Sequence, residues 1–529
     1  MLKKIDSIES LNFKKSQKEK NIPHAVVIGA GFGGLAAAMR LGAVGFKVTV
    51  LEQLESVGGR GSSINRNGFR FDLGPTIVTK PQLFEELWSF CGKKFEDDVK
   101  LLPCDPFYQV IFNDGSNLKT FKDEKLMIEQ IKKISPSDIQ GYQRLMKDSK
   151  ERYEFAFSSP NKIGRVPMNN IFHTLKVIPK FISLRADRSV YSNVAKYIKD
   201  ERLRMALSFH PLFVGGNPFK VTSMWGLVSY LEKKYGVHYP IGGMIAIANS
   251  MEKIILKQGN KVFLKKKVNK ILYNQKKVFG VELDDGTKIN SDIVVSNSDS
   301  GFTYNNLLKG KIKKRWTIKK IKKQKWSMGL CVWYFGTKDT RHLWKNIGLH
   351  TVLNGPRYKG LVKDIFLKGK LSEDMSLYVY RPSFCDNTVA PENCDTFYAL
   401  SPVPNLNFDN VVNWKKEIKK YKSKMASFID KKLLPGFEEK IVESHFMSPN
   451  DFERRYSSPF GSGFSLEPRM FQSAWFRPHN ISEEIEGLFL VGAGTHPGPG
   501  VPGVIASAEI LTKLVNSYIN QNDKNFNLK

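Results

Sequence analysis

The glycines and the acid that could bind a dinucleotide lie in the first part of the chain. Gly29, Gly31, Gly33 and Gly34 follow one another closely, and Glu52 lies about 20 residues beyond them. Such glycines allow a tight turn, let a pyrophosphate lie against bare backbone and let a helix pack closely on a strand. An acid at that distance can accept hydrogen bonds from ribose hydroxyls. These residues predict a dinucleotide-binding site.

The flanking segments have the patterns needed to position this site. An apolar run of strand length, 25–28, precedes the glycines, an alanine-rich helical segment follows them, and a second strand, 47–51, ends at Glu52. The start of the helix offers free N–H groups and the positive end of its dipole to the phosphates. A glycine turn in an unrelated α/β protein is the alternative, but the elements occur in the order that the motif requires.

A second group of glycines and an arginine indicate which dinucleotide binds. Gly58, Gly59 and Arg60 follow the second strand, and the segment 71–76 has the sequence FDLGPT. A nicotinamide site does not need this continuation. The stretch resembles the FAD-binding amine oxidase and carotenoid desaturase superfamily, in which the glycine pair and the arginine continue along the cofactor. The resemblance implies that Gly59 and Arg60 contact FAD and that Val268 contacts its adenine through the backbone.

A similar strand, glycine turn and helix occur near the end of the chain. The strand 488–491 leads into the turn 492–498, and a helical pattern covers 502–515. Its helix start can place N–H groups near the flavin ring, where they would stabilise negative charge on the reduced ring. The region resembles the carotenoid desaturase signature. That resemblance implies further FAD contacts at Gly492, Gly494, Thr495, Gly503 and Val504.

These motifs predict an α/β fold with a discontinuous, Rossmann-like FAD-binding domain. A mixed α+β substrate domain with a helical lid or membrane-contact segment completes it. The expected order is a basic tail at 1–22, FAD-binding segments at 23–100, 236–300 and 481–529 (the last including a C-terminal tail), and substrate-domain segments at 101–235 and 301–480.

The middle of the chain is rich in aromatic residues and glycines and contains few ionisable groups. The segments 210–219, HPLFVGGNPF, and 238–243, HYPIGG, are the clearest examples. At this stretch the chain resembles the bacterial and fungal type of phytoene desaturase, and the resemblance covers residues 23–515. It implies an enzyme of carotenoid biosynthesis that desaturates phytoene, an apolar polyene, stepwise towards lycopene.

Catalysis is expected to rest on the flavin, because the chain shows no HExxH, GxSxG or paired-carboxylate pattern. Our hypothesis is hydride transfer from an allylic carbon to flavin N5, followed by loss of a neighbouring proton. Candidates for a catalytic side chain are Asp138, Arg144, His210 and His238. Each has a structural alternative: a solvated helix for the first two, and a satisfied histidine among apolar residues for the last two.

Related activities stay open at this point. A dehydrosqualene desaturase, a later-acting carotenoid dehydrogenase, a carotene isomerase and a flavin amine oxidase would all carry the same cofactor motifs. Prenyl-protein escort and GDP-dissociation-inhibitor proteins share the fold and bind partners without redox work. The intact glycine set argues against that non-enzymatic class.

The composition is strongly basic, with 82 Lys and Arg against 51 Asp and Glu and a net charge of +31. Such a charge can attract an anionic membrane surface, although a lysine-rich coding bias would also produce it. No nucleic-acid-binding motif accompanies the basic runs, so nucleic acid is not an expected partner. The five cysteines form no CxxC pair and have no His partner at metal-ligand spacing, so we expect reduced thiols and no metal site.

The segment 166–198 combines an apolar stripe with cationic edges, which is typical of an interfacial helix. A helix pair covering the core is the alternative. No apolar run reaches the roughly 20 residues that cross a bilayer, and 1–22 has no apolar signal core. We therefore expect a cytoplasmic enzyme that lies peripherally on the inner face of the cell membrane. A membrane quinone is a candidate electron acceptor.

Overall fold

The sheet that carries the first glycine turn is assembled from distant parts of the chain. The computed structural model describes residues 22–158, 163–310 and 315–521. Across this sheet the strands are β19 (Leu488–Leu490), β13 (Ile293–Ser296), β1 (His24–Ile28), β2 (Lys47–Leu51) and β9 (Lys261–Phe263). All neighbouring strands pair in parallel. The structure thus confirms the discontinuous, Rossmann-like arrangement.

Both faces of the parallel sheet are covered, which explains why its strands are almost continuously apolar. One face packs against α1 (Phe32–Ala43), α2 (Gln82–Phe90), α9 (Met244–Lys257) and α15 (Val501–Gln521). The other face packs against an antiparallel sheet of β10 (Val268–Asn274), β11 (Lys277–Leu283) and β12 (Lys288–Asn290). Ala36, Ala37 and Ala38 of α1 are fully buried, and their small side chains let α9 and α15 pack closely beside it.

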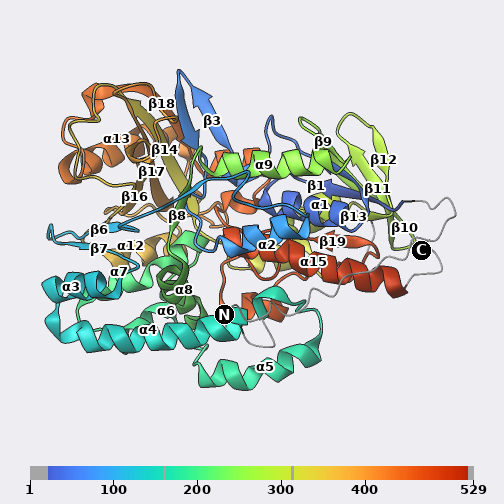
Figure 1. Ribbon diagram of the computed structural model, residues 1–529, viewed down its shortest axis with the longest axis horizontal. Coiled ribbons are helices and arrows are strands. Elements are labelled where there is room, and N and C mark those ends of the chain that lie inside the picture. Colours follow the sequence, from blue (N-terminus) through green and yellow to red (C-terminus); the bar gives the residue numbers. More distant parts are fainter. Residues whose placement is uncertain (1–21, 159–162, 311–314, 522–529) are drawn as a thin grey trace.

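A second, larger sheet forms the centre of the other part of the molecule (Figure 1). Its strand order is β18 (Ile441–Met447), β14 (Gly329–Thr337), β17 (Asp395–Val403), β16 (Leu377–Tyr380), β15 (His350–Leu353), β6 (Gln109–Ile111) and β7 (Asn117–Lys119). Only β15 and β6 pair in parallel among these described strands. The helix α13 (Trp414–Lys432) covers one face through its apolar side chains.

A group of helices lies below the larger sheet in Figure 1. It consists of α3 (Glu124–Ile134), α4 (Ile139–Tyr153), α5 (Ile171–Ser183), α6 (Val190–Ala195), α7 (Glu201–Ser208), the 3-10 helix His210–Val214, α8 (Leu227–Tyr235) and α12 (Tyr358–Lys363). The helix α5 stands apart from the others at the lower edge of the view. This group and the larger sheet share one apolar core.

Short elements connect the two parts. They are the hairpin of β3 (Ser63–Arg66) and β4 (Phe69–Asp72), the pair β5 (Leu101–Pro103) and β8 (His238–Pro240), and the helices α10 (Ser300–Phe302), α11 (Ile318–Lys323) and α14 (Pro449–Tyr456). The β3–β4 hairpin follows β2 in the sequence, and β8 comes directly before α9.

The strands of the two sheets come from different segments of the chain, and the division into domains stays a prediction. Residues 23–100, 236–300 and 481–521 contribute every strand of the parallel sheet, and 101–235 and 301–480 contribute every strand of the larger one. The expected basic tail lies outside the described residues except for Ile22, and so does 522–529. Within the described ranges, no helix is both long and apolar enough to cross a bilayer.

Candidate functional site

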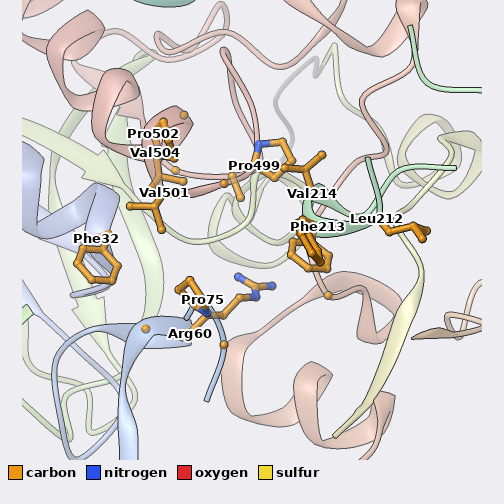
Figure 2. Close-up of a pocket in the computed structure, with 18 of the residues that line it drawn as sticks. Phe32, Arg60, Pro75, Leu212, Phe213, Val214, Pro499, Val501, Pro502 and Val504 are labelled. Carbon is orange, nitrogen blue, oxygen red and sulfur yellow. The ribbon is translucent and has the colours of Figure 1, made fainter. Parts of the chain in front are cut away.

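One cavity of about 550 Å³ extends between the two parts of the molecule. Figure 2 shows residues from distant segments around it. Arg60 and Pro75 come from the segment after β2, Leu212 to Val214 come from the 3-10 helix after α7, and Pro499 to Val504 come from the start of α15. A molecule bound here would therefore contact the glycine-rich turns and the larger core at the same time.

The first glycine turn forms one end of this cavity. Gly29, Gly31, Gly33 and Glu52 line it together with Val268 from β10. The Glu52 carboxylate accepts hydrogen bonds from the backbone N–H groups of Ala30 at 2.7 Å and Leu54 at 2.9 Å. Burial raises the pKa of Glu52, and these N–H groups oppose the rise. Each carboxylate oxygen has a second lone pair, so the acid can still accept a hydrogen bond from a ribose.

Two of the glycines leave no room for a side chain. A Cβ on Gly34 would lie 2.0 Å from the carbonyl oxygen of Gly29, so α1 could not pack on the turn. A Cβ on Gly33 would lie 2.6 Å from Oδ1 of Asn297 and 3.1 Å from the backbone of Gly492. Gly34 itself does not line the cavity, in agreement with a packing role, whereas Gly33 lines it.

Arg60 extends beside Pro75 in Figure 2 and lines the cavity together with Gly59. Its Nη2 donates to Oγ of Ser458 at 2.7 Å, and its buried Nε has no hydrogen-bond partner among the described residues. Burial lowers the pKa of Arg60, although the nearby Asp299 opposes this. A buried cationic donor without a partner is costly, and an acceptor group on a bound cofactor would satisfy it. The cavity therefore fits a dinucleotide with an anionic pyrophosphate.

The closing turn lies beside the first one, since a Cβ on Gly33 would lie 3.1 Å from the backbone of Gly492. Gly492, Gly503 and Val504 line the cavity, as expected, but Gly494 and Thr495 do not. A Cβ on Gly494 would meet the backbone N of Ser300 at 2.6 Å, and the hydroxyl of Thr495 is buried against Gly492 and Asn480. The structure gives these two residues roles within the turn. Val501 to Val504, the first turn of α15, line the cavity, so the positive end of this helix dipole lies there.

The four candidates for a catalytic side chain differ in whether they line the cavity. His210 lines the cavity, whereas Asp138, Arg144 and His238 are absent from its wall. The carboxylate of Asp138 accepts the backbone N–H groups of Lys199 and Asp200. Arg144 is exposed on α4, and Nδ1 of His238 lies 3.3 Å from the carbonyl oxygen of Val78. The structure brings only His210 of these four to the site.

Beyond the cofactor end the cavity is walled by apolar and aromatic side chains. They come from the 3-10 helix, α8, α12 and the face of the larger sheet, and include Phe209, Phe213, Leu231, Leu361, Phe366, Tyr378 and Tyr398. A wall of this kind binds a hydrocarbon because it removes apolar surface from water.

Three polar residues of the site were missed in the sequence. Glu232 and Tyr108 line the cavity and hydrogen-bond each other at 2.6 Å, and Arg477 lies behind the closing turn. Glu232 lies in the stretch SYLEKKY, which is also the pattern of an exposed helix. Arg477 lies in the stretch QSAWFRP, but its contacts are to backbone carbonyls that sequence cannot identify.

Comparisons with known proteins agree with this geometry. The family model "Flavin containing amine oxidoreductase" matches residues 32–511. The chain is 55% identical over 501 residues to a neurosporene-forming phytoene desaturase of Rhodobacter capsulatus, covering 94% of this chain and 95% of the relative. It is 40% identical to a lycopene-forming phytoene desaturase of Pantoea ananas, covering 92% of this chain and 98% of the relative.

A solved structure supports the fold. An oxidoreductase from Methanosarcina mazei superposes with a TM-score of 0.63 at 18% identity, covering 93% of this chain and all of that one. The expected cofactor class and the expected enzyme class are confirmed: this is an FAD-dependent oxidoreductase. The chain belongs to the flavin containing amine oxidoreductases and, within that family, to the bacterial phytoene desaturases.

Proposed function

We propose that this protein desaturates phytoene in carotenoid biosynthesis and that neurosporene is its main product. The observation that carries the proposal is the single cavity that joins two glycine turns to an apolar, aromatic chamber. The relative from Rhodobacter capsulatus is neurosporene-forming, and the more distant one from Pantoea ananas is lycopene-forming. Three desaturations are therefore expected in preference to four.

The side chains of the chamber bind and orient the substrate. A polyene offers no group for a hydrogen bond, so the shape of the chamber and the exclusion of water fix its position. When bound, FAD supplies the acceptor for the hydride that leaves the substrate. Arg60 and the N-terminus of α15 would hold positive charge and N–H donors against the cofactor, and Phe213 and Val214 line the chamber beside them.

An exposed apolar patch lies beside two residues that line the cavity, and we propose that it docks on an anionic membrane. On α5, Phe172 is 70% and Ile182 is 65% exposed. The patch consists of these two residues with Ile171, Leu175 and Ile178 of α5 and Met470, Phe471 and Phe476 of the neighbouring turns. The turn Ala474–Phe476 contacts α5, and both Ala474 and Phe181 line the cavity.

The charges around the patch match anionic lipid headgroups. Lys176, Lys180 and Arg185 are exposed, and Arg188 is half-buried. Helices with apolar residues on one face and cations at the edges lie in the plane of a bilayer interface. A lipid-soluble substrate could enter the cavity there without crossing water. The same route would admit a membrane quinone, which we propose as the electron acceptor.

The activity is tested by incubating purified protein and FAD with phytoene-containing liposomes under anaerobic conditions, with and without a quinone. Flavin bleaching together with a neurosporene spectrum is the expected result, and chromatography counts the steps. A flavin that stays oxidised with phytoene and bleaches with another polyene would contradict the substrate. Multiple turnovers only when quinone is present would support a quinone acceptor.

Membrane docking is tested by liposome pelleting. Charge reversal at Lys176, Lys180, Arg185 and Arg188 should weaken binding to anionic vesicles at least tenfold, since each basic residue near such a surface contributes about 1 kcal/mol. The matched control reverses four exposed lysines of α13, which lies at the other side of the molecule in Figure 1: Lys415, Lys416, Lys419 and Lys420. Equal weakening in both variants would show that only the net charge matters.

A further inference from the structure

The polar groups in the apolar chamber are few, and two of them form a buried acid–imidazole pair. Glu232 on α8 and His210 at the start of the 3-10 helix both line the cavity and are both buried. Oε2 of Glu232 lies 3.1 Å from Nε2 of His210. The described ion pairs give Glu232 no lysine or arginine partner.

The other oxygen of Glu232 is held by Tyr108, whose hydroxyl donates to Oε1 at 2.6 Å. Burial and the neighbouring Glu232 carboxylate raise the pKa of Tyr108 well above its ordinary value, so the phenol remains a donor. The carboxylate is thus fixed by a neutral donor on one side and by the imidazole on the other. A carboxylate in this position favours the tautomer that carries its hydrogen on Nε2.

That tautomer leaves the lone pair of His210 on Nδ1. Among the described residues Nδ1 has no hydrogen-bond partner, and the ring stacks on Phe209 with centroids 4.8 Å apart. Val214 belongs to the same 3-10 helix and lies close to the chain just after the closing turn. A Cβ on Gly500 would lie 3.4 Å from Cγ1 of Val214. The helix that carries His210 therefore lies beside the flavin end of the chamber.

Among the described residues, no lysine or arginine forms an ion pair with His210 or Glu232. From the sheet side, the ring of His350 lies against Tyr108 and stacks on Tyr378, and burial lowers the pKa of His350 to about 3, so His350 is neutral. Burial raises the pKa of Tyr378 well above its ordinary value, so Tyr378 is neutral too. Glu232 is then the one charged group that the described structure places against His210.

We propose that His210, oriented by Glu232, accepts the proton that the substrate loses in each desaturation. The inference rests on the proposed function, with FAD as the oxidant that takes the hydride. The C–H bond next to the cationic carbon breaks, its electron pair forms the new C=C bond, and the proton forms an N–H bond at Nδ1. The Glu232 carboxylate stabilises the resulting imidazolium, as acids do in acid–histidine pairs elsewhere. Proton transfer by a positioned base typically contributes 10²–10⁴-fold in rate.

The test uses the FAD-loaded protein with phytoene liposomes and follows polyene formation in a single anaerobic turnover between pH 5 and 9. His210→Gln should be at least about 100-fold slower and should lack the fall in rate that the unchanged protein shows as pH decreases. Glu232→Gln should keep that fall but move its midpoint to lower pH, because the imidazolium loses its anionic neighbour. His238→Gln is the matched control and should behave like the unchanged protein.

A measurement without turnover accompanies these rates. With ¹³C-labelled histidine, the Cε1 resonance that disappears in His210→Gln should titrate at a lower pH in Glu232→Gln than in the unchanged protein. A His210→Gln protein that retains FAD and gives the original rate and pH profile would overturn the inference. If His210→Gln does not retain FAD, the Glu232→Gln variant decides the question. Midpoints of its pH–rate profile and its NMR titration that equal those of the unchanged protein would overturn the inference. Failure of the unchanged protein to desaturate phytoene would instead refute the proposed function.

Discussion

The guanidinium of Arg477 donates a hydrogen bond from Nη2 to the carbonyl oxygen of Ala493 at 2.7 Å. Further bonds from the same group reach the carbonyl oxygens of Thr495, Gln472 and Leu466. Arg477 is fully buried, and burial lowers its pKa to about 10. One planar cation thus fixes the closing turn from behind, while the front of the turn lines the cavity.

Replacement of Arg477 by lysine should loosen this turn. An ammonium group cannot reproduce the fork that reaches four carbonyl oxygens, and charge-assisted hydrogen bonds contribute about 1.5–3 kcal/mol each. Arg477→Lys should lower the free energy of unfolding by about 3 kcal/mol and weaken FAD retention, measured by urea denaturation and by flavin absorbance after gel filtration. Arg454→Lys, at an 81% exposed side chain, should change neither. Equal behaviour of the two variants would contradict the role of Arg477.

A methyl group at Gly33 should interfere with cofactor binding. The Cβ of an alanine would contact Asn297 and the backbone of Gly492, so the two glycine turns would have to separate. Gly33→Ala should raise the dissociation constant for FAD at least tenfold in a fluorescence titration. Gly348→Ala is the control, since a Cβ there meets nothing within 4 Å. Unchanged FAD affinity in Gly33→Ala would show that the turns tolerate the methyl group.

A large side chain at Leu361 should shorten the apolar chamber. Leu361 is buried on α12 and lines the cavity, so Leu361→Trp places an indole in the space proposed for the polyene. Phytoene turnover should fall at least tenfold or stop at an earlier product, while FAD content stays unchanged. Lys359→Trp adds the same side chain at an exposed position of this helix and should be neutral. Chromatography of the products distinguishes these outcomes.

Asp72 should make the stability of the protein depend on pH. Burial raises its pKa from 3.8 to about 6, and Oδ1 has no hydrogen-bond partner among the described residues. The folded state therefore binds a proton more tightly than the unfolded state, so the stabilisation is complete below pH 3.8 and is lost as pH rises through 6. The loss at pH 8 amounts to about 3 kcal/mol.

Asp72→Asn should remove this dependence, so the variant should gain stability relative to the unchanged protein between pH 5 and pH 8. Urea denaturation at both pH values measures the gain. Asp187→Asn is the control: Asp187 is exposed, and its hydrogen bond with Arg185 lowers its pKa, so its replacement should bring no gain at pH 8. Parallel stability curves for Asp72→Asn and the unchanged protein would contradict the assignment.

The cofactor end of the site could be predicted from sequence because its signals are local. Gly29, Gly31 and Gly33 line the cavity, and Glu52 follows at the end of the next strand, as the motif requires. The exposed apolar stripe on α5 was also visible, because helical periodicity alone determines which side chains share a face.

The chamber could not be predicted in the same way, because its residues meet only through long-range packing. Tyr108 and Glu232, which hydrogen-bond each other in the chamber, are 124 positions apart in the chain. Asp138 was considered for the site because it precedes a helix, but the structure uses it to accept two backbone N–H groups of another segment. Residue type alone did not distinguish an acid of the site from an acid that accepts backbone hydrogen bonds elsewhere.

The order of the segments in the parallel sheet has a consequence for the synthesis of the protein. Its first strand is made within the first 30 residues, but β19 and the glycine turn before α15 follow more than 450 residues later. A chain on the ribosome folds from its N-terminal end as it emerges. The cofactor site therefore cannot close until β19 and α15 have left the exit tunnel, so FAD cannot be enclosed before both have been synthesised.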